Sequence, residues 1–283
     1  MVSVVARGEL DKILGDINPD YVEERKKMVS DYNPIRSVIE KYLLLLEDYE
    51  DYFGALSGVI NTTAWSITDV LKPSEITAFY DFAVQNKCEF KDDRDITREY
   101  VLGDFTRKLT QNSYDAGYNN FSFHSHSLGL ISKLYGSENN PLVISVDDVG
   151  SLDILGSTYY RGKDCNYVQM TLRGPARSYG TGSNHSVFVL EGEDSGCLGW
   201  SNQPSESIGL FDDGEVERAS DCTFIIKGKL GIDSGVHCEA CTFKVYSQEA
   251  VEQLLRAIGY NWNNRIILVH PDGSEELKRD FNG

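Results

Sequence analysis

The sequence predicts an α+β protein, in which an N-terminal α-helical domain is followed by a short parallel β-helix, or β-solenoid, and by a C-terminal cap of one helix and one strand. Three observations support this fold class. A strand-plus-glycine unit recurs between residues 142 and 247, helical periodicity precedes it, and one amphipathic segment follows it. We therefore expect domains at residues 1–138, 139–247 and 248–283.

The segments before the repeat have the periodicity or the boundary signals of helices. They are residues 21–32, 35–53, 73–87 and 96–110. Apolar residues recur in 35–53 at three- and four-residue steps, which is typical of an amphipathic helix. Its other face carries the acidic residues Glu47, Asp48, Glu50 and Asp51. A solvated face is our interpretation of this cluster, and a cation site is the alternative.

The recurring unit is a strand with large apolar residues two and four positions before an anchor residue. The anchors of the clearest copies are Gly174, Gly192, Gly228 and Ser247. Their spacing gives steps of 18, 36 and 19 residues, and a weaker copy occupies 142–148. A unit this short cannot bury its apolar face alone, so the copies should stack as coils of a solenoid. We expect the following side chains to be buried against one another in neighbouring coils: Phe188, Leu190, Phe224 and Ile226.

Two further features of the repeat concern its connections. A second glycine follows most anchors by about seven residues and predicts a tight corner. These glycines are Gly156, Gly180, Gly199 and Gly235. The step of 36 residues between Gly192 and Gly228 is about twice the length of the others, and we call it the double step. It contains residues 201–220, which form either a degenerate coil or a protruding acidic loop. The loop alternative would display Asp212, Asp213, Glu215 and Glu217.

The runs 187–199 and 227–235 resemble the GXGXG β-helix domain of glutamate synthases and formylmethanofuran dehydrogenases. In both runs a strand ends at a glycine, a small turn follows, and a later glycine closes the coil. The resemblance covers about residues 142–247. Ser-Asp-Cys-Thr and Glu-Ala-Cys-Thr stand where the family has a Met-x-Gly-Gly step. The resemblance implies a structural packing element and brings no catalytic or cofactor-binding residues to this chain.

The segment after the repeat predicts a cap for the open end of the solenoid. Ser247 has the residue type of a helix N-cap, and residues 248–258 have an amphipathic pattern that ends at Gly259. Residues 265–270 form an apolar strand, and Pro271 begins its turn. An uncapped solenoid end would expose apolar core and unpaired backbone groups.

Cysteine and histidine residues supply two candidate metal sites. The first is Cys222, His237, Cys238 and Cys241, which includes one C-x-x-C motif. Thiolates and neutral imidazoles are zinc ligands. We expect Cys222 and Cys241 to occupy equivalent places in adjacent coils, about 4.8 Å apart. Stacked small residues at a coil corner are the alternative that we favour, and we expect no zinc in an elemental analysis of the purified protein.

The second candidate metal site is a histidine pair. His124 and His126 have the same parity on an expected strand, so both could ligate one divalent metal. We favour a polar pair that faces solvent, opposite buried phenylalanines at positions 121 and 123.

Composition restricts the functional classes. The formal net charge is −17, which disfavours binding along a nucleic-acid backbone. The longest aliphatic run is too short for a membrane span, and the N-terminal residues lack the pattern of a signal peptide. We therefore expect a cytoplasmic protein with six reduced cysteines.

The sequence favours a non-catalytic scaffold or protein-interaction protein whose partner is a protein, with a basic one suiting the acidic surface. It contains no clear pairing of a nucleophile with a base and no phosphate-binding glycine loop. A carbohydrate-active β-helix enzyme is the first alternative, and a metal-binding module is the second. Carboxylates and aromatic rings that could serve a carbohydrate site are Asp147, Asp148, Asp153, Tyr159, Tyr160, Tyr179 and Trp200.

Overall fold

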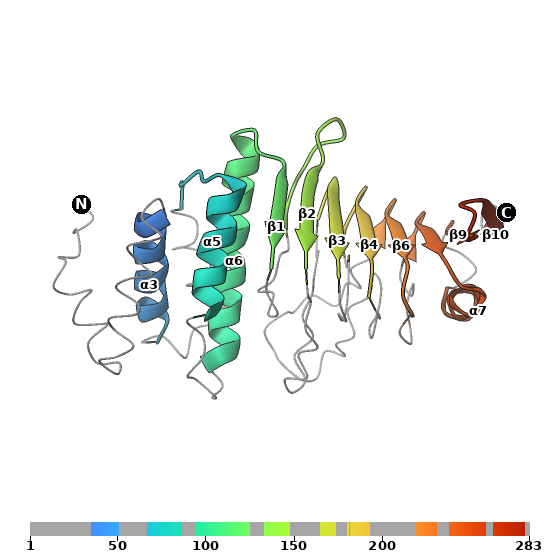
Figure 1. The fold of residues 1–283 in the computed structure, drawn as a ribbon, viewed down its shortest axis with the longest axis horizontal. Helices are drawn as coiled ribbons and strands as arrows, with labels where there is room; N and C mark the ends of the chain where they lie inside the picture. The colour runs from blue at the N-terminus through green and yellow to red at the C-terminus, as the bar shows by residue number, and fades with distance from the viewer. Residues whose placement is uncertain are drawn as a thin grey trace.

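The computed structural model is an elongated α+β molecule, with helices at one end, a row of strands along its length, and a helix with two strands at the other end (Figure 1). The structure describes residues 35–50, 67–85, 94–124, 133–147, 165–173, 180, 182–192, 219–230, 238–258 and 263–280. The α+β class, the solenoid and the C-terminal helix and strand expected from the sequence are confirmed. The helix expected at 21–32 lies outside the described residues.

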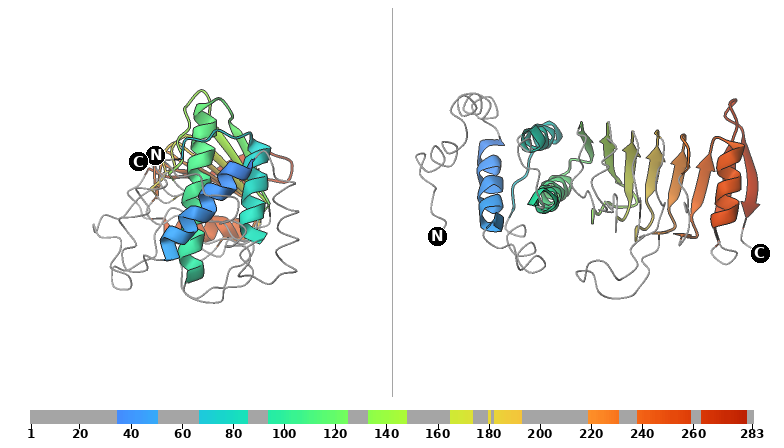
Figure 2. Two further views of the ribbon diagram at one scale, coloured as in Figure 1. Left: turned by 90° about the vertical axis from the view of Figure 1, so that its left-hand side faces the viewer. Right: turned by 90° about the horizontal axis from the view of Figure 1, so that it is seen from below.

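The helical end contains α3 (Arg36–Glu50), α5 (Pro73–Gln85) and α6 (Arg94–Asp115). Aromatic side chains hold these helices together. The Tyr42 ring lies 5.4 Å from those of both Phe79 and Phe105, and the latter two rings are 5.1 Å apart. Helix α5 also packs on the first strand, where Tyr80 meets the edge of Phe123 at 5.3 Å. Figure 2 shows these helices covering one end of the row of strands.

The strands form one mixed sheet in the order β1-β2-β3-β4-β6-β8-β9-β10. Their bounds are β1 Asn120–Phe123, β2 Leu142–Val146, β3 Val168–Leu172, β4 Val187–Leu190, β6 Thr223–Ile226, β8 Thr242–Val245, β9 Arg265–Val269 and β10 Glu275–Asp280. All neighbours pair in parallel except β9 and β10, which are antiparallel. The short strands β5 (Ala219–Ser220) and β7 (Cys238–Glu239) pair in parallel in a second sheet.

The inner side of the sheet contains the apolar columns that the repeat predicts. Phe188 is in register with Phe224, and Phe224 with Phe243. Leu190 and Ile226 form the parallel row two residues further along the strands. All five side chains are at most 2 % exposed, so the predicted burial and register are confirmed. The buried core runs without a break from the helices through the strands to α7.

The double step between β4 and β6 holds an excursion from the sheet. Val187 pairs directly with Thr223, although 36 residues separate them, whereas Gln169 and Val187 are neighbours 18 residues apart. A further coil of this sheet would place a strand between β4 and β6, and no strand lies there. The topology therefore favours the loop alternative for residues 201–220, and residues 193–218 lie outside the described part of the chain.

Just before most of the parallel strands, one residue with a left-handed backbone conformation turns the chain into the strand. This conformation was not predicted from the sequence. The residues with φ between 48° and 53° at this place are Tyr167, His185, Asp221, Ala240 and Asn263. In three coils the amide of this residue donates to a carbonyl in the next coil, as from His185 N–H to Ser220 O at 3.2 Å. These bonds offset the steric cost of the conformation, which is about 1–2 kcal/mol per residue. Of the glycines expected at corners, Gly180 is described and has φ +62°, and the others lie outside the described residues.

The sheet extends beyond the expected solenoid boundaries at both ends. Strand β1 pairs in parallel with β2 and therefore belongs to the stack, although it precedes residue 139. Strand β9 continues the parallel stack beyond β8, with Phe243 in register with Ile266. The terminal strands alternate less regularly or lack an anchor glycine, so the repeat alone did not reveal them.

The C-terminal cap begins with α7 (Gln248–Ala257), as predicted. The Ser247 hydroxyl accepts a hydrogen bond from the Ala250 N–H at 3.2 Å, which caps the first turn. Val251 and Leu254 are buried toward β8 and β9. The helix ends at Ile258, whose N–H donates to Leu254 O, and the predicted turn at Pro271 joins β9 to β10.

Candidate functional site

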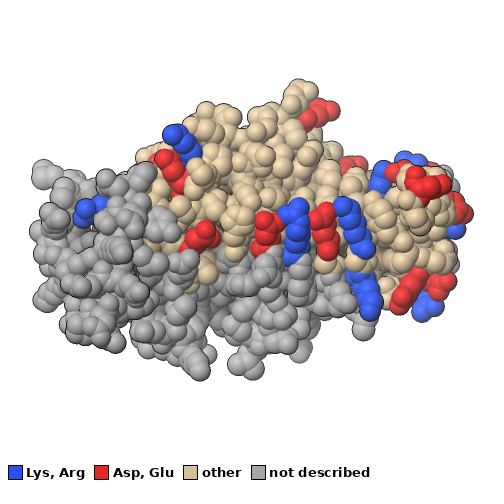
Figure 3. Space-filling model, viewed as in Figure 1, with Lys and Arg blue, Asp and Glu red and all other residues tan. Residues whose placement is uncertain are grey.

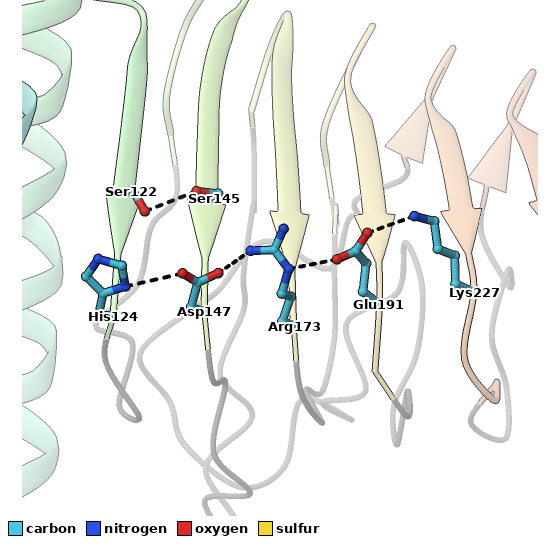
Figure 4. Close-up of polar contacts among 7 residues, drawn as sticks. All are labelled: Ser122, His124, Ser145, Asp147, Arg173, Glu191 and Lys227. Carbon is cyan, nitrogen blue, oxygen red and sulfur yellow. Dashed lines mark hydrogen bonds and ion pairs between the residues drawn. The ribbon is translucent and has the colours of Figure 1, made fainter.

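A row of polar side chains crosses the carboxyl ends of the strands on the outer side of the sheet (Figure 4). Each follows the last residue of its strand, and together they are called the charge ladder: His124, Asp147, Arg173, Glu191 and Lys227. The main-chain ladder continues through the same positions, because the amides of the last four donate to the preceding strand at 2.9–3.0 Å. Parallel register therefore brings side chains from five coils into one line.

The charges alternate in sign along the charge ladder from Asp147 to Lys227. Asp147 contacts the Arg173 guanidinium and lies 3.2 Å from His124 Nδ1. The Glu191 carboxylate lies 2.7 Å from Arg173 Nε and 2.7 Å from Lys227 Nζ. The row from Asp147 to Lys227 is therefore neutral as a group. Cross-strand pairs of opposite charge favour this register over a slipped one.

The pKa shifts in the charge ladder follow from these contacts. Hydrogen bonds from Lys227 and Arg173 lower the pKa of Glu191, and the same bonds raise the pKa of both basic residues. Charged forms are therefore stabilised throughout, and none of these three groups is poised for proton transfer near neutral pH. The carboxyl group of Asp81 on α5 shifts in the other direction. Burial raises its pKa, and this effect exceeds the lowering by the nearby charge of His124.

The histidine pair, a candidate metal site for which a polar pair facing solvent was the favoured interpretation, is only half described. His124 is exposed at the end of β1 and is paired with Asp147, while His126 lies outside the described part of the chain. The burial of the phenylalanines at positions 121 and 123 is as expected. The carboxylate of Asp147, which was a candidate for carbohydrate chemistry, is occupied by His124 and Arg173. The other carbohydrate candidates lie outside the described residues.

The cysteine group lies on the inner side of the sheet. Cys222 and Cys241 each precede an aligned strand residue, so they occupy equivalent places in adjacent coils, as predicted. Both are at most 1 % exposed, and Cys238 is fully buried. Cys222 Sγ lies 3.2 Å from Ser220 O and Cys241 Sγ 3.3 Å from Glu239 O, so main-chain carbonyls surround the sulfurs. Carbonyl oxygens accept hydrogen bonds from thiols, so both sulfurs have a main-chain partner.

The thiols of this group also contact one another. The pKa values of Cys222 and Cys238 are raised, mainly because both thiols donate hydrogen bonds to Cys241 and secondly because both are buried. The same bonds, accepted by Cys241, lower the pKa of its thiol, which makes it the first of the three to ionise. Within the described residues no group of three or more potential ligands is placed to hold a metal ion. His237 lies outside them, so the absence of zinc stays a prediction.

Asn264 continues the cysteine column into the cap. Its amide accepts from Cys241 N–H at 2.8 Å and donates to Cys238 O at 2.6 Å. The side chain is fully buried. A buried amide that satisfies two main-chain groups of the neighbouring coil is a structural element, which agrees with the interpretation of this column as coil packing.

The outer side of the sheet beside the charge ladder has no charged side chain over five strands. We call these residues the outer face: Asn120, Ser122, Val143, Ser145, Gln169, Thr171, Val187, Val189, Thr223 and Ile225. Ser145 donates to Ser122 across β1 and β2 at 3.2 Å. In Figure 3 this area forms a continuous uncharged region bordered by the alternating charges of the ladder. The first charge beyond it is Lys244 of β8, which pairs with Glu275 at 2.6 Å.

The sequence contains a signal for the charge ladder that was not used. Aligning the copies on their anchors places Arg173, Glu191 and Lys227 directly before Gly174, Gly192 and Gly228. Their signs alternate along that column of the alignment. The acidic candidates at 47–51 and 212–217 have no described side chains, so their role stays a prediction.

Comparisons with known proteins add no family to these observations. No protein-family model, curated protein or solved structure matches the chain. The resemblance to the GXGXG β-helix domain therefore stays a proposal based on the sequence. Among the described residues, no helix combines the length and the apolar character that a membrane crossing requires.

Proposed function

We propose that this protein is a non-catalytic interaction protein of the cytoplasm, whose solenoid binds a protein partner on the outer face. The observation that carries the proposal is the uncharged arrangement of outward side chains from β1 to β6. Interface cores are depleted in charged residues, and extended solenoid surfaces are well suited to docking.

The outer face is held rigid by what lies beneath it. Val187 and Val189 alternate with Phe188 and Leu190, and the latter pair is locked in the fully buried columns. The outward valines are themselves half-buried by their neighbours. A surface already fixed in the free protein loses little conformational entropy when a partner binds.

The charge distribution favours a basic partner. The excursion at 193–218 contains seven acidic residues and one basic residue, so it carries a net charge of −6 out of the −17 of the chain. It leaves the sheet between β4 and β6, the last two strands of the outer face. Clustered negative charge accelerates encounter with a positively charged protein and makes that encounter sensitive to salt.

The contacts of the charge ladder support binding over catalysis. Asp147 and Glu191 are each held between two basic groups, which removes them as free acid or base groups. The two carboxylates therefore do not form the freely acting pair that glycoside hydrolysis uses.

A charge placed on the outer face tests the proposal. Tagged wild-type chain is used to recover partners from the native cell, and the partners are identified by mass spectrometry. Val189→Glu should lose the specific partner, since a carboxylate would be desolvated at the interface. Val70→Glu is a matched control, because Val70 is 50 % exposed and lies in the segment before α5. Thermal unfolding checks that both variants fold.

The electrostatic part has its own measurement. Reversing Asp212, Asp213, Glu215 and Glu217 to lysine should slow association with the recovered partner by about tenfold and reduce the salt dependence of its rate. The dissociation rate should change little. A partner that binds Val189→Glu as tightly as the wild type would overturn the docking surface, and turnover of a polysaccharide by the isolated chain would overturn the function.

A further inference from the structure

The charge ladder becomes its own complement when its direction is reversed. From Asp147 to Lys227 the signs run negative, positive, negative, positive. From the other end the order is positive, negative, positive, negative. An antiparallel copy of the row therefore places every charge opposite one of the other sign. The four side chains lie in one line on the outer side of their strands, and the parallel register continues through them without a bulge (Figure 4).

These charges are available for a second contact. Their side chains are between 26 % and 49 % exposed. The charge ladder and the outer face are visible from the same side of the molecule (Figure 3). One of these surfaces is uncharged and the other is neutral as a group. Two copies that meet here therefore avoid local repulsion, although the whole chain carries a net charge of −17.

We propose that two copies of this chain form a dimer in which their outer faces meet and their charge ladders run antiparallel. The two-fold axis lies along the strand direction, midway between β3 and β4. Arg173 then faces Glu191 of the second copy, and Asp147 faces its Lys227. Symmetry repeats both pairs, and the interface closes on itself. This inference rests on the proposed function, because it takes the outer face as the docking surface and names a second copy as what covers it until the partner binds.

The charge order selects the position of the axis. An axis centred on β3 would bring the two Arg173 side chains together and place Asp147 against Glu191. An axis centred on β4 would bring the two Glu191 side chains together and place Arg173 against Lys227. Like charges in opposed positions are destabilising. An axis between β2 and β3, or between β4 and β6, restores opposite signs but leaves Lys227 or Asp147 without an opposed ladder charge.

The outer face is compatible with the same axis. Thr171 faces Val189 of the second copy, and Ser145 faces its Ile225, so no charge is buried at the centre of the interface. These four side chains are already half-buried in one copy. Sheets that stack face to face pack about 10 Å apart. The five strands of the outer face span only about 25 Å. An interface of this extent belongs to the weak end of specific contacts, so a tighter partner displaces the second copy.

Inverting the charge ladder tests the proposal without removing the alternation of charge within one chain. The inverted variant carries Asp147→Lys, Arg173→Glu, Glu191→Lys and Lys227→Glu. It should fold and dimerise like the wild type, because its ladder is also its own complement. Against a wild-type ladder, however, an antiparallel inverted ladder places like charges opposite each other. Mixed dimers of the two chains should therefore be at least about tenfold rarer than mixed dimers of two differently tagged wild-type chains.

Two measurements on the whole chain follow this sorting. Sedimentation equilibrium at concentrations up to about 0.5 mM gives the dimerisation of each chain alone. Native mass spectrometry of equimolar mixtures counts the mixed dimers, and thermal unfolding checks that each variant folds. Arg173→Glu with Glu191→Lys, a smaller exchange that is also self-complementary, should sort from the wild type in the same direction. Glu252→Lys with Arg256→Glu exchanges an exposed ion pair on α7 and should mix freely with the wild type.

Three outcomes would overturn the dimer. They are a wild-type chain that stays monomeric throughout this range, a folded inverted variant that does not dimerise, and mixed dimers in the statistical proportion, which would place the interface elsewhere. None of them decides the proposed function, because recovery of the partner by the wild type and by Val189→Glu is a separate readout. Failure of that recovery test would in turn leave the sorting of the two ladders unchanged.

Discussion

The inner and outer sides of the same strands each carry a row of aligned side chains, in one register but with different physical roles. The inner ladder is the row of stacked aromatic rings, and the outer ladder is the charge ladder. On the inner side the rings of Phe188, Phe224 and Phe243 stack at 5.4 and 5.3 Å and are excluded from solvent. On the outer side Arg173 and Glu191 alternate in water. Burial of aromatic area contributes several kcal/mol per side chain, whereas exposed ion pairs contribute up to about 1 kcal/mol. The comparison indicates that the inner ladder provides stability and the outer ladder helps to fix the register.

The largest expected effect is the loss of the central ring. Phe224→Ala removes a fully buried side chain that stacks on both neighbours, and should lower the free energy of unfolding by about 3–5 kcal/mol. Denaturant unfolding followed by circular dichroism measures it. Ile225→Ala, one residue away on the outer face, is the control and should cost clearly less because Ile225 is only half-buried. Equal effects at the two positions would contradict the division between inner and outer sides.

A smaller effect is expected where the backbone approaches the inner ladder. A Cβ at Gly180 would lie 2.8 Å from Phe188 Cε2, and Gly180 also has φ +62°. Gly180→Ala should therefore destabilise the chain by about 2 kcal/mol or more, from steric overlap and from the left-handed backbone. Gly273→Ala isolates the backbone contribution, because Gly273 has φ +83° and open space around its Cβ position. Melting temperatures that fall equally would show that the aromatic column adjusts freely to the methyl group.

The sequence predicted the inner side of the solenoid better than the outer side, and the reason is physical. Burial restricts the residue type at each inner position, so Phe188 and Phe224 repeat visibly at the same distance from their anchors. Outer positions tolerate many residues. The charge ladder is a relation between coils, Arg173 to Glu191, that a search for identical residues overlooks. The left-handed corners are still harder, since His185 and Asp221 share a backbone conformation and no side-chain property.

The candidate cysteine site illustrates how the same pattern supports two interpretations. The repeat correctly aligned Cys222 with Cys241, because their copies share one register. It could not tell packing from ligation, since both place sulfurs close together. Packing is favoured by the main-chain carbonyls around the sulfurs and by Asn264. Main-chain groups are common to all residues and Asn264 is distant in the sequence, so neither feature has a signature in the local sequence.

The smallest expected effect concerns the outer ladder and depends on pH. The pKa of Glu191 is lowered from its ordinary value of 4.5 in the folded protein, so its carboxylate stabilises the fold fully above that value. As the pH falls through the lower folded pKa, both states become protonated and the contribution disappears. Glu191→Gln keeps an oxygen acceptor for Arg173 and Lys227 but removes the charge. It should therefore cost less than about 1 kcal/mol at pH 7, and the difference from the wild type should shrink as the pH falls below 4.5 and vanish below the lowered pKa of the folded state.

Unfolding by urea at a series of pH values in low salt measures this difference. Glu252→Gln on α7 serves as the control, because its carboxylate lies 4.0 Å from Arg256 and both side chains are largely exposed. That variant should show no resolvable change at any pH. High salt should reduce the Glu191→Gln effect, since the ladder side chains are accessible to ions. A difference that persists unchanged in acid would mean that Glu191 acts through its shape and hydrogen bonds, and the outer ladder would then resemble the inner one in depending on fit more than on charge.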